Sequence, residues 1–260
     1  DFTESTVEAS AMSGSLLGGR VSLDIETVKA QRPPAWRIRA QGEIDTAELV
    51  PLLQSWVIDE NVKGVAPWTG TLAVDGGTAQ LEINSDLSGV GITLPAPLSK
   101  GPDEKRESTV RASYGRDKHL YQFESGLLKG SLEYRRSESG LMIRNGVVAL
   151  GKVKPGLPPT QGIRIEIRQP FLNADKWLAV LAPDEVNRPA QPRAFQSALR
   201  VVELELDEVR LLSRNLGATN ARAISGNGRD WKAWISGDFI SGQITAALTS
   251  KGEPNNYTMN

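Results

Sequence analysis

Alternation of apolar and polar residues dominates the chain and predicts β-strands. Residues 21–26, 163–168 and 202–207 each alternate strictly between an apolar and a polar side chain. Such a pattern puts every second side chain on the same face of a strand. Short turn sequences, among them Asp75-Gly76-Gly77 and Asn145-Gly146, separate segments of this kind. The pattern predicts a mainly β protein built as an antiparallel meander, in which each sheet has an apolar and a polar face.

Two segments have helical spacing instead. Asp45–Glu48 reads D-x-x-E, a variant of the helix-capping box, and predicts a helix from Asp45 to Trp56. Asn173 is a good helix cap and predicts a second helix from Asn173 to Leu181. Aligning the two caps preserves the order of strand, cap and helix, which indicates a weak internal repeat. We therefore expect one β-rich section, 1–260, of a longer repeat-built protein, with repeats at about 20–160 and 161–260.

Composition narrows the possible functions. The chain has 30 basic and 31 acidic residues and a formal net charge of -1, which argues against a nucleic-acid partner. It has no cysteine, so thiol catalysis, disulfides and cysteine-ligated metals are excluded. His119 is the only histidine, so a metal site could use carboxylates only, and no serine lies in a G-x-S-x-G motif. We expect no catalytic residues, no metal and no cofactor.

One alternative function rests on aromatic residues near carboxylates. Asp230 precedes Trp231, and Asp238 follows Trp234 by four positions. An aromatic ring beside a carboxylate can form a platform for sugars, although ordinary sheet packing explains the same spacing. The alternative is therefore a carbohydrate-binding or carbohydrate-active β-domain. His119, just before a predicted strand, is interpreted as a solvated strand-end residue.

The chain carries no sign of its own membrane anchor or export signal. No apolar run approaches the roughly 20 residues that span a bilayer. The chain begins with Asp1 and lacks the basic-then-apolar start of a signal peptide. We expect it to be an internal piece, or a processed form, of a longer protein.

Several motifs resemble those of a known family. Ser85–Lys100 reads SDLSGVGITLPAPLSK and resembles a signature of the YhdP branch of the AsmA-like proteins. Residues 145–151 resemble that family's repeated strand with a glycine at each end. Residues 162–178 resemble its element of a strand followed by L-D-x-x-x-W, with Asn173 where the family has Asp. Residues 230–244 resemble its closing hairpin, which has an early Trp and a late G-x-I.

This resemblance implies a bridge-like lipid transfer protein that is anchored in the inner membrane of a Gram-negative bacterium and spans the periplasm. It implies a long, twisted antiparallel sheet folded into an open, taco-like apolar groove, with two or three short helices. Phospholipids would move between the inner and outer membranes along the groove without enzymatic chemistry or a cofactor. The expected partners are phospholipids and adjoining repeats of the same chain, and only parts of the parent protein outside this chain would contact a membrane.

Apolar strand positions are the candidates for the groove lining, because burial stabilises an acyl chain by about 0.8 kcal/mol per methylene. We expect Ile163, Ile165 and Ile167 on one strand face and Arg164, Glu166 and Arg168 on the other. A purely structural spacer, with its apolar face fully internal, is a third possibility. The candidate lining residues are Ile38, Leu72, Val74, Leu81, Ile83, Tyr121, Phe123, Leu132, Ile163, Ile165, Ile167, Leu204, Leu206 and Ile244.

Overall fold

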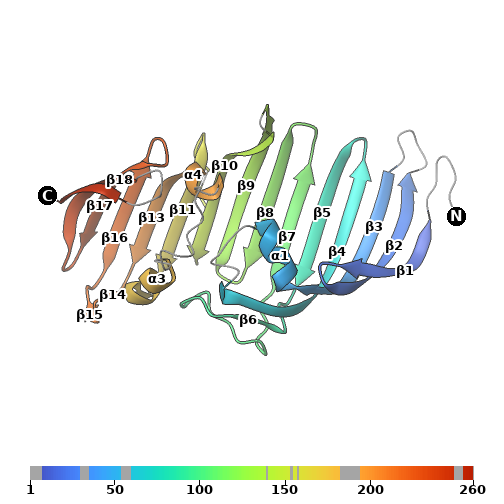
Figure 1. Cartoon of the computed structure of the whole chain (residues 1–260), viewed down its shortest axis with the longest axis horizontal. Helices are drawn as coiled ribbons and strands as arrows, with labels where there is room; N and C mark the ends of the chain where they lie inside the picture. Colours follow the sequence, from blue (N-terminus) through green and yellow to red (C-terminus); the bar gives the residue numbers. More distant parts are fainter. Residues whose placement is uncertain are drawn as a thin grey trace. The chain divides into compact units, whose positions relative to one another are not determined.

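The computed structural model describes residues 8–29, 35–53, 60–138, 140–152, 155–156, 158–181, 194–248 and 254–259. The chain divides into two compact units. Unit 1 comprises Asp1–Thr93 and Leu98–Gly126, and unit 2 comprises Leu94–Pro97 and Leu127–Asn260. Each unit is built on one open β-sheet, and the helices are short (Figure 1). The prediction of a mainly β fold with an open sheet and few short helices is confirmed.

The sheet of unit 1 is antiparallel throughout. Its strand order is β1-β2-β3-β4-β5-β7-β8, and the short strand β6 pairs with the first residues of β4. Tight connections, such as the Gly76-Gly77 turn between β4 and β5, join several of these neighbours. The elements of unit 1 are β1 (Ala9–Leu16), β2 (Gly19–Lys29), β3 (Ala35–Asp45), α1 (Thr46–Leu53), β4 (Val62–Asp75), β5 (Thr78–Ser85), β6 (Val90–Ile92), β7 (Ser108–Tyr114) and β8 (Lys118–Ser125).

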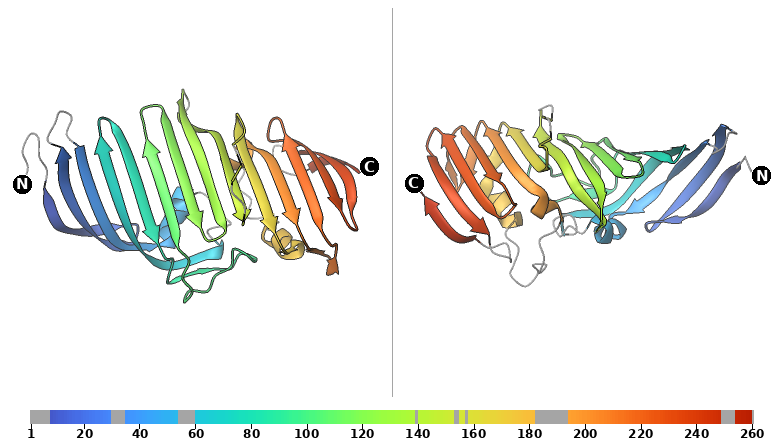
Figure 2. Two further views of the ribbon diagram at one scale, coloured as in Figure 1. Left: turned by 180° about the vertical axis from the view of Figure 1, so that it is seen from behind. Right: turned by 90° about the horizontal axis from the view of Figure 1, so that it is seen from above.

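The sheet of unit 2 has the order β9-β10-β11-β13-β16-β17-β18-β19, and β12, β14 and β15 form a separate small sheet. Figure 2 shows the strands of each unit from behind and from above. The elements of unit 2 are β9 (Leu128–Ser137), β10 (Gly140–Gly151), β11 (Gly162–Gln169), β12 (Leu172–Asn173), α3 (Ala174–Leu181), α4 (Ala194–Ala198), β13 (Leu199–Leu206), β14 (Val209–Leu211), β15 (Arg214–Asn215), β16 (Thr219–Ser225), β17 (Asp230–Gly237), β18 (Ser241–Leu248) and β19 (Pro254–Met259).

Unit 2 departs from the expected meander at two places. Strands β10 and β11 are parallel, and so are β11 and β13. Two parallel neighbours need a connection that runs from the end of one strand back to the start of the other. Antiparallel neighbours, in contrast, can be joined by a tight turn. The connection from β11 to β13 contains α3 and α4, and α4 contacts β10 and β11. In Figure 1, α4 lies in front of these strands.

The Asn145-Gly146 sequence is not the turn that we predicted. Both residues lie inside β10, next to a register shift against β9. A Cβ atom at Gly146 would collide with the side chain of Leu132 and the carbonyl group of Ser131. The glycine therefore permits a close approach of two strands. An Asn-Gly pair can mark such an approach as well as a hairpin turn.

Both predicted helices form directly after their predicted caps. The Asn173 side-chain oxygen accepts a hydrogen bond from the Lys176 backbone N–H at 3.0 Å, and α3 ends at Leu181 as predicted. The Asp45 carboxylate accepts one from the Ala47 N–H at 2.9 Å. In a complete capping box, the Asp45 backbone N–H would donate a hydrogen bond to the Glu48 side chain. Here it donates to the Leu17 carbonyl oxygen at 3.1 Å. The described helix α1 ends at Leu53, and Trp56 lies outside the described residues.

The SDLSGVGITLPAPLSK segment forms an excursion between β5 and β7 that polar contacts hold together. Lys100 is buried, and its Nζ donates to the carbonyl oxygens of Val90 and Gly101, both at 2.8 Å. Burial is the main reason that the pKa of the Lys100 ammonium is lowered. The Arg106 guanidinium donates to the carbonyl oxygens of Leu98 and Ser99. These contacts explain why a lysine and an arginine close this segment.

Candidate functional site: the apolar sheet faces

The register of unit 1 places its apolar side chains on one face of the sheet. Residues that lie directly opposite in antiparallel neighbours point to the same side. Two rows therefore run across six strands. One row consists of Ile25, Ile38, Leu72, Leu81, Ala112 and Tyr121, and the next consists of Leu23, Ala40, Gly70, Ile83, Val110 and Phe123.

A third row borders the first one and ends in polar rings. It consists of Thr27, Trp36, Val74, Ala79, Tyr114 and His119. We call these three rows the apolar face of unit 1. Seven of the fourteen residues that the sequence predicts to line the groove lie on this face: Ile38, Leu72, Val74, Leu81, Ile83, Tyr121 and Phe123.

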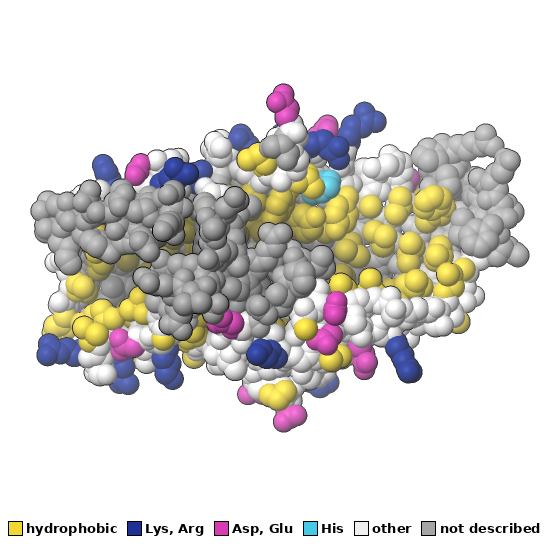
Figure 3. Space-filling model, in the orientation of Figure 1, with side chains coloured by type: hydrophobic (Ala, Val, Ile, Leu, Met, Phe, Trp, Pro, Cys, Tyr) yellow, Lys and Arg dark blue, Asp and Glu magenta, His cyan; other side chains and the backbone are white. Residues whose placement is uncertain are grey.

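The apolar face of unit 1 is only partly covered. Of its larger side chains, Leu72, Leu81 and Ile83 are half-exposed, and Val110 is 41% exposed. Figure 3 shows hydrophobic side chains gathered over the strands of unit 1 in the right half of the view. Contiguous exposed apolar surface is uncommon on soluble proteins and usually marks a binding surface. The face therefore has the chemistry to hold apolar chains.

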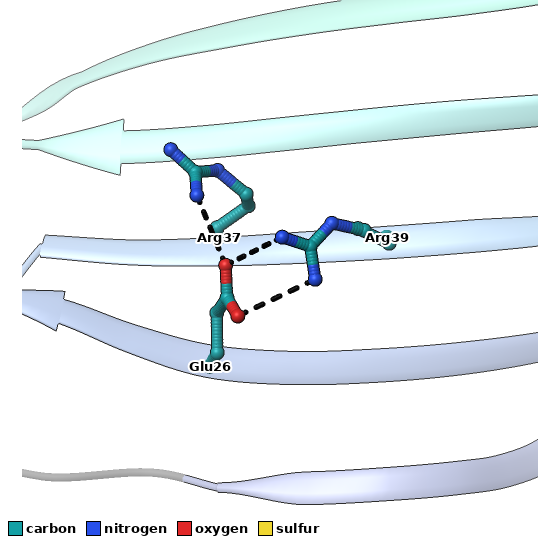
Figure 4. Close-up of polar contacts among 3 residues, drawn as sticks. All are labelled: Glu26, Arg37 and Arg39. Carbon is teal, nitrogen blue, oxygen red and sulfur yellow. Dashed lines mark hydrogen bonds and ion pairs between the residues drawn. The ribbon is translucent and has the colours of Figure 1, made fainter.

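The opposite face of the same sheet is polar and ion-paired. Glu26 on β2 contacts Arg37 at 3.0 Å and Arg39 at 2.8 Å, both on β3 (Figure 4). On β5 and β7, the Arg111 Nε atom lies 2.7 Å from the Glu82 carboxylate. The hydrogen bond from Arg111 is the main cause that lowers the pKa of Glu82, and Asn84 adds to it. This face is suited to water, so unit 1 is amphipathic across the thickness of one sheet.

In unit 2 the seven remaining candidates also share one face. Ile163, Ile165 and Ile167 alternate along β11 with Arg164, Glu166 and Arg168, as predicted. The rows on this apolar face of unit 2 include Leu132-Gly146-Ile163, Val148-Ile165-Val202-Ala223-Ala233-Ile244, Leu150-Ile167-Leu204-Ala221-Ile235 and Gln169-Leu206-Thr219.

Burial divides the candidates of unit 2. Ile163 is fully buried at 0% exposure, and Leu206 is 4% exposed, so these two are core residues. Ile165, Ile167 and Leu204 are half-exposed, as are Leu132 and Ile244. Ile163 lies on β11, one of the two strands that α4 contacts. Apolar residues that follow the same alternating pattern are thus buried at some positions of this unit and accessible to solvent at others.

The two tryptophans of the possible sugar platform do not share one face of the sheet. Trp231 and Trp234 lie on opposite faces of β17, because they are three positions apart on one strand. The Asp230 carboxylate accepts a hydrogen bond from the Asn227 side chain at 2.6 Å. The Asp238 carboxylate accepts one from the Ala218 N–H at 2.8 Å. The Asp230 carboxylate thus binds within its own turn, and the Asp238 carboxylate binds the backbone just before β16.

His119 is not the solvated strand-end residue that we expected. It is the second residue of β8, is half-buried and lies on the apolar face of unit 1. Its ring contacts Tyr114 edge to face, with the ring centroids 5.3 Å apart. Val110, Ala112 and Tyr114 were not among the predicted lining residues, although they alternate with period two along β7 and could have been found from this signal.

The described residues also bear on a metal site and on a membrane-spanning helix. Within these ranges, no group of three or more His, Cys, Asp or Glu residues is arranged to hold a metal ion. None of the helices in the described part of the chain has the length and apolar character needed to cross a membrane.

Comparisons with known proteins agree with the resemblance of the motifs. The family model described as YhdP protein matches residues 1–255. The "Intermembrane phospholipid transporter YhdP" of Escherichia coli (strain K12) is 24% identical over 189 residues, which cover 69% of this chain and 14% of that protein. The chain thus spans about one seventh of the length of this relative. No solved structure matches the chain. The match over nearly its whole length shows that the chain belongs to the YhdP family.

Proposed function

We propose that this chain is a section of a lipid-transfer path, in which the apolar face of unit 1 shields the acyl chains of phospholipids. The observation that carries the proposal is the set of contiguous, half-exposed apolar rows backed by an ion-paired polar face. Membership in the YhdP family and the name of the Escherichia coli relative, an intermembrane phospholipid transporter, support phospholipid as the cargo.

The direction of the rows suits transfer. Each row runs across six strands, and the five spacings of about 4.8 Å between them add up to roughly 24 Å. Removing an acyl chain from water onto such a surface stabilises it by about 0.8 kcal/mol per buried methylene. The first two rows consist almost entirely of apolar residues, so a chain can shift along them without a large change in free energy. No bond is made or broken, and the transfer is non-enzymatic and needs no cofactor.

In unit 2, the proposed contacts with lipid are the half-exposed candidates: Leu132, Ile165, Ile167, Leu204 and Ile244. Ile163 and Leu206 would support that surface from the core. The weak repeats at about 20–160 and 161–260 remain part of the proposal, as do adjoining repeats of the parent chain as partners. The proposed location is the periplasm, with the parent protein tethered to the inner membrane.

Lipid extraction tests the function with a matched pair of variants. Leu81 and Gln80 are neighbours on β5 that face opposite sides of the sheet. Leu81→Asp puts a carboxylate, which is costly to desolvate, in the middle of the apolar rows, whereas Gln80→Asp puts the same group on the polar face. Purified protein is extracted with organic solvent, and bound phospholipid is measured by mass spectrometry.

We expect phospholipid with the wild-type chain and with Gln80→Asp, and a loss of most of it with Leu81→Asp at a similar melting temperature. A wild-type chain that binds no phospholipid would overturn the proposal, and so would full retention by Leu81→Asp. A change in tryptophan fluorescence on adding sugars, together with the absence of lipid, would favour the carbohydrate alternative.

A further inference from the structure

The apolar face of unit 1 ends in a cluster of polar rings at the turn between β7 and β8. Tyr114 and His119 close the third row, and Tyr121 closes the first row beside them. Tyr114 contacts both other rings edge to face, with centroids 5.3 Å from His119 and 5.8 Å from Tyr121. Figure 3 shows the histidine at the upper edge of the hydrophobic surface. We call these three residues the aromatic end of the apolar face.

The aromatic end contains a polar atom without a partner. The Nδ1 atom of His119 is buried, and no hydrogen-bond partner for it exists in the described part of the chain. A buried polar atom without a hydrogen bond costs about 1–3 kcal/mol, and nearly all such atoms in folded proteins have a protein, water or ligand partner. An imidazole nitrogen can donate to an anionic oxygen when it carries a proton. A ligand at this end would supply the missing partner.

The phenol beside this nitrogen is kept neutral. Burial is the main cause that raises the pKa of Tyr114, and the neighbouring Tyr121 raises it further through charge and a hydrogen bond. A neutral phenol adds no negative charge that would repel an anion. The aromatic end can therefore present the unpartnered His119 nitrogen to an anion directly beside apolar surface.

The turn that leads into this cluster is cationic. Arg116, Asp117 and Lys118 are exposed, which leaves one net positive charge. The Gly115 N–H donates to the Lys118 carbonyl at 2.9 Å, so the turn is tight and both cations stay close to Tyr114 and His119 along the chain. Arginine is especially suited to phosphate, because its planar guanidinium can donate two parallel hydrogen bonds.

We propose that the aromatic end and Arg116 bind the phosphate group of a phospholipid whose acyl chains lie on the apolar face of unit 1. The proposal rests on the proposed function and adds to it a fixed position for the headgroup. The lipid is held at one edge of the sheet by its phosphate and across the rows by its chains. A diacylglycerol with the same chains has no phosphate and lacks the first contact.

Because His119 is the only histidine, its ring signals in an NMR spectrum can be recognised without assigning the rest of the chain. The whole chain is titrated separately with phosphatidylglycerol, with diacylglycerol carrying the same acyl chains, and with inorganic phosphate. We expect phosphatidylglycerol to shift the His119 signals more than diacylglycerol does. Inorganic phosphate at the same concentration should leave them in place, because it lacks the contribution of the chains.

Two variants separate a headgroup site from simple packing. Losing a charge-assisted hydrogen bond in Arg116→Gln should weaken phosphatidylglycerol binding about tenfold and leave diacylglycerol binding unchanged. Arg111→Gln, which removes the same charge from the opposite face of β7, is the matched control and should leave both unchanged. His119→Phe keeps an aromatic ring, removes the unpartnered nitrogen and should abolish the preference for phosphatidylglycerol without lowering the melting temperature.

The outcomes distinguish this proposal from the proposed function. Equal His119 shifts and equal affinities for the two lipids, unchanged in Arg116→Gln, would overturn the headgroup site while lipid binding stands. If inorganic phosphate alone produces the full shift, the site binds free anions and the headgroup proposal is wrong. If neither lipid binds the wild-type chain, the proposed function itself fails.

Discussion

The apolar faces of the two units have the same alternation of residues but different accessibility. In unit 1, Leu72, Leu81 and Ile83 are half-exposed, and every strand pair is antiparallel. In unit 2, Ile163 on β11, a strand with the same alternation but two parallel neighbours, is fully buried. Periodicity therefore establishes which side chains share a face, whereas the connections between strands decide whether that face is covered.

Parallel pairing is the physical origin of the difference. A connection between parallel neighbours must return along the full length of the strands, and on the way it passes over one face of the sheet. Unit 2 has two such connections, and α4 in the second of them contacts the strands that carry Gly146 and Ile163. Unit 1 places its irregular excursion between β5 and β7, where Lys100 and Arg106 hold it together. Its apolar rows consequently remain accessible.

The largest expected effect tests the sealed part of unit 2. Ile163→Asp places a carboxylate at a fully buried position, which should cost several kcal/mol of unfolding free energy and unfold the unit. Circular dichroism during thermal unfolding measures the loss. A variant that melts like the wild-type chain would show that Ile163 is not a core residue.

A smaller loss is expected in unit 1 from Lys100→Met. The carbonyl groups of Val90 and Gly101 lose their donor, at a cost of about 1–3 kcal/mol for each one left unpaired. Urea unfolding measures the change. The control is Lys105→Met, which removes an ion pair between an exposed lysine and Asp86 and should cost about 1 kcal/mol or less. Equal stability of the two variants would refute the structural role of Lys100.

Ile165→Asp tests the half-exposed part of unit 2. Because Ile165 retains access to water, the carboxylate can stay hydrated, so bound lipid should fall while much of the fold survives. Glu166→Ile, on the opposite face, should keep lipid binding and lose about 1 kcal/mol, since the Glu166 carboxylate accepts a hydrogen bond from the Gly156 N–H. If Ile165→Asp keeps both its melting temperature and its lipid, this strand does not line the path.

The smallest effect belongs to the polar face of unit 1. Arg39→Gln removes one of the two arginines that contact Glu26, and both partners are largely exposed. Such pairs contribute less than about 1 kcal/mol, and salt weakens them. Melting curves at low and high salt should show a small difference that disappears at high salt, with lipid binding unchanged. A marked loss of lipid would mean that the polar face takes part in binding.

Much of this arrangement could be predicted from the sequence. Period two assigns Ile38, Leu72 and Leu81 to one face, because the register of an antiparallel sheet keeps such positions together. The parallel pairing of β11 depends on strand order, which no local pattern encodes, so the burial of Ile163 could not be foreseen. His119 was misplaced because strand β8 begins at Lys118, two residues before Leu120, where the apolar pattern suggests the strand starts.

Site-specific photocross-linking tests the central claim most directly. A photoreactive amino acid is placed in turn at Leu81, at Gln80 on the opposite face of β5, and at Ile163 in the core of unit 2, and each protein is irradiated with bound phospholipid. The open apolar face of unit 1 predicts lipid adducts at Leu81 and none at Gln80 or Ile163. Adducts at Gln80 equal to those at Leu81, or none at Leu81 in a protein that carries lipid, would contradict it.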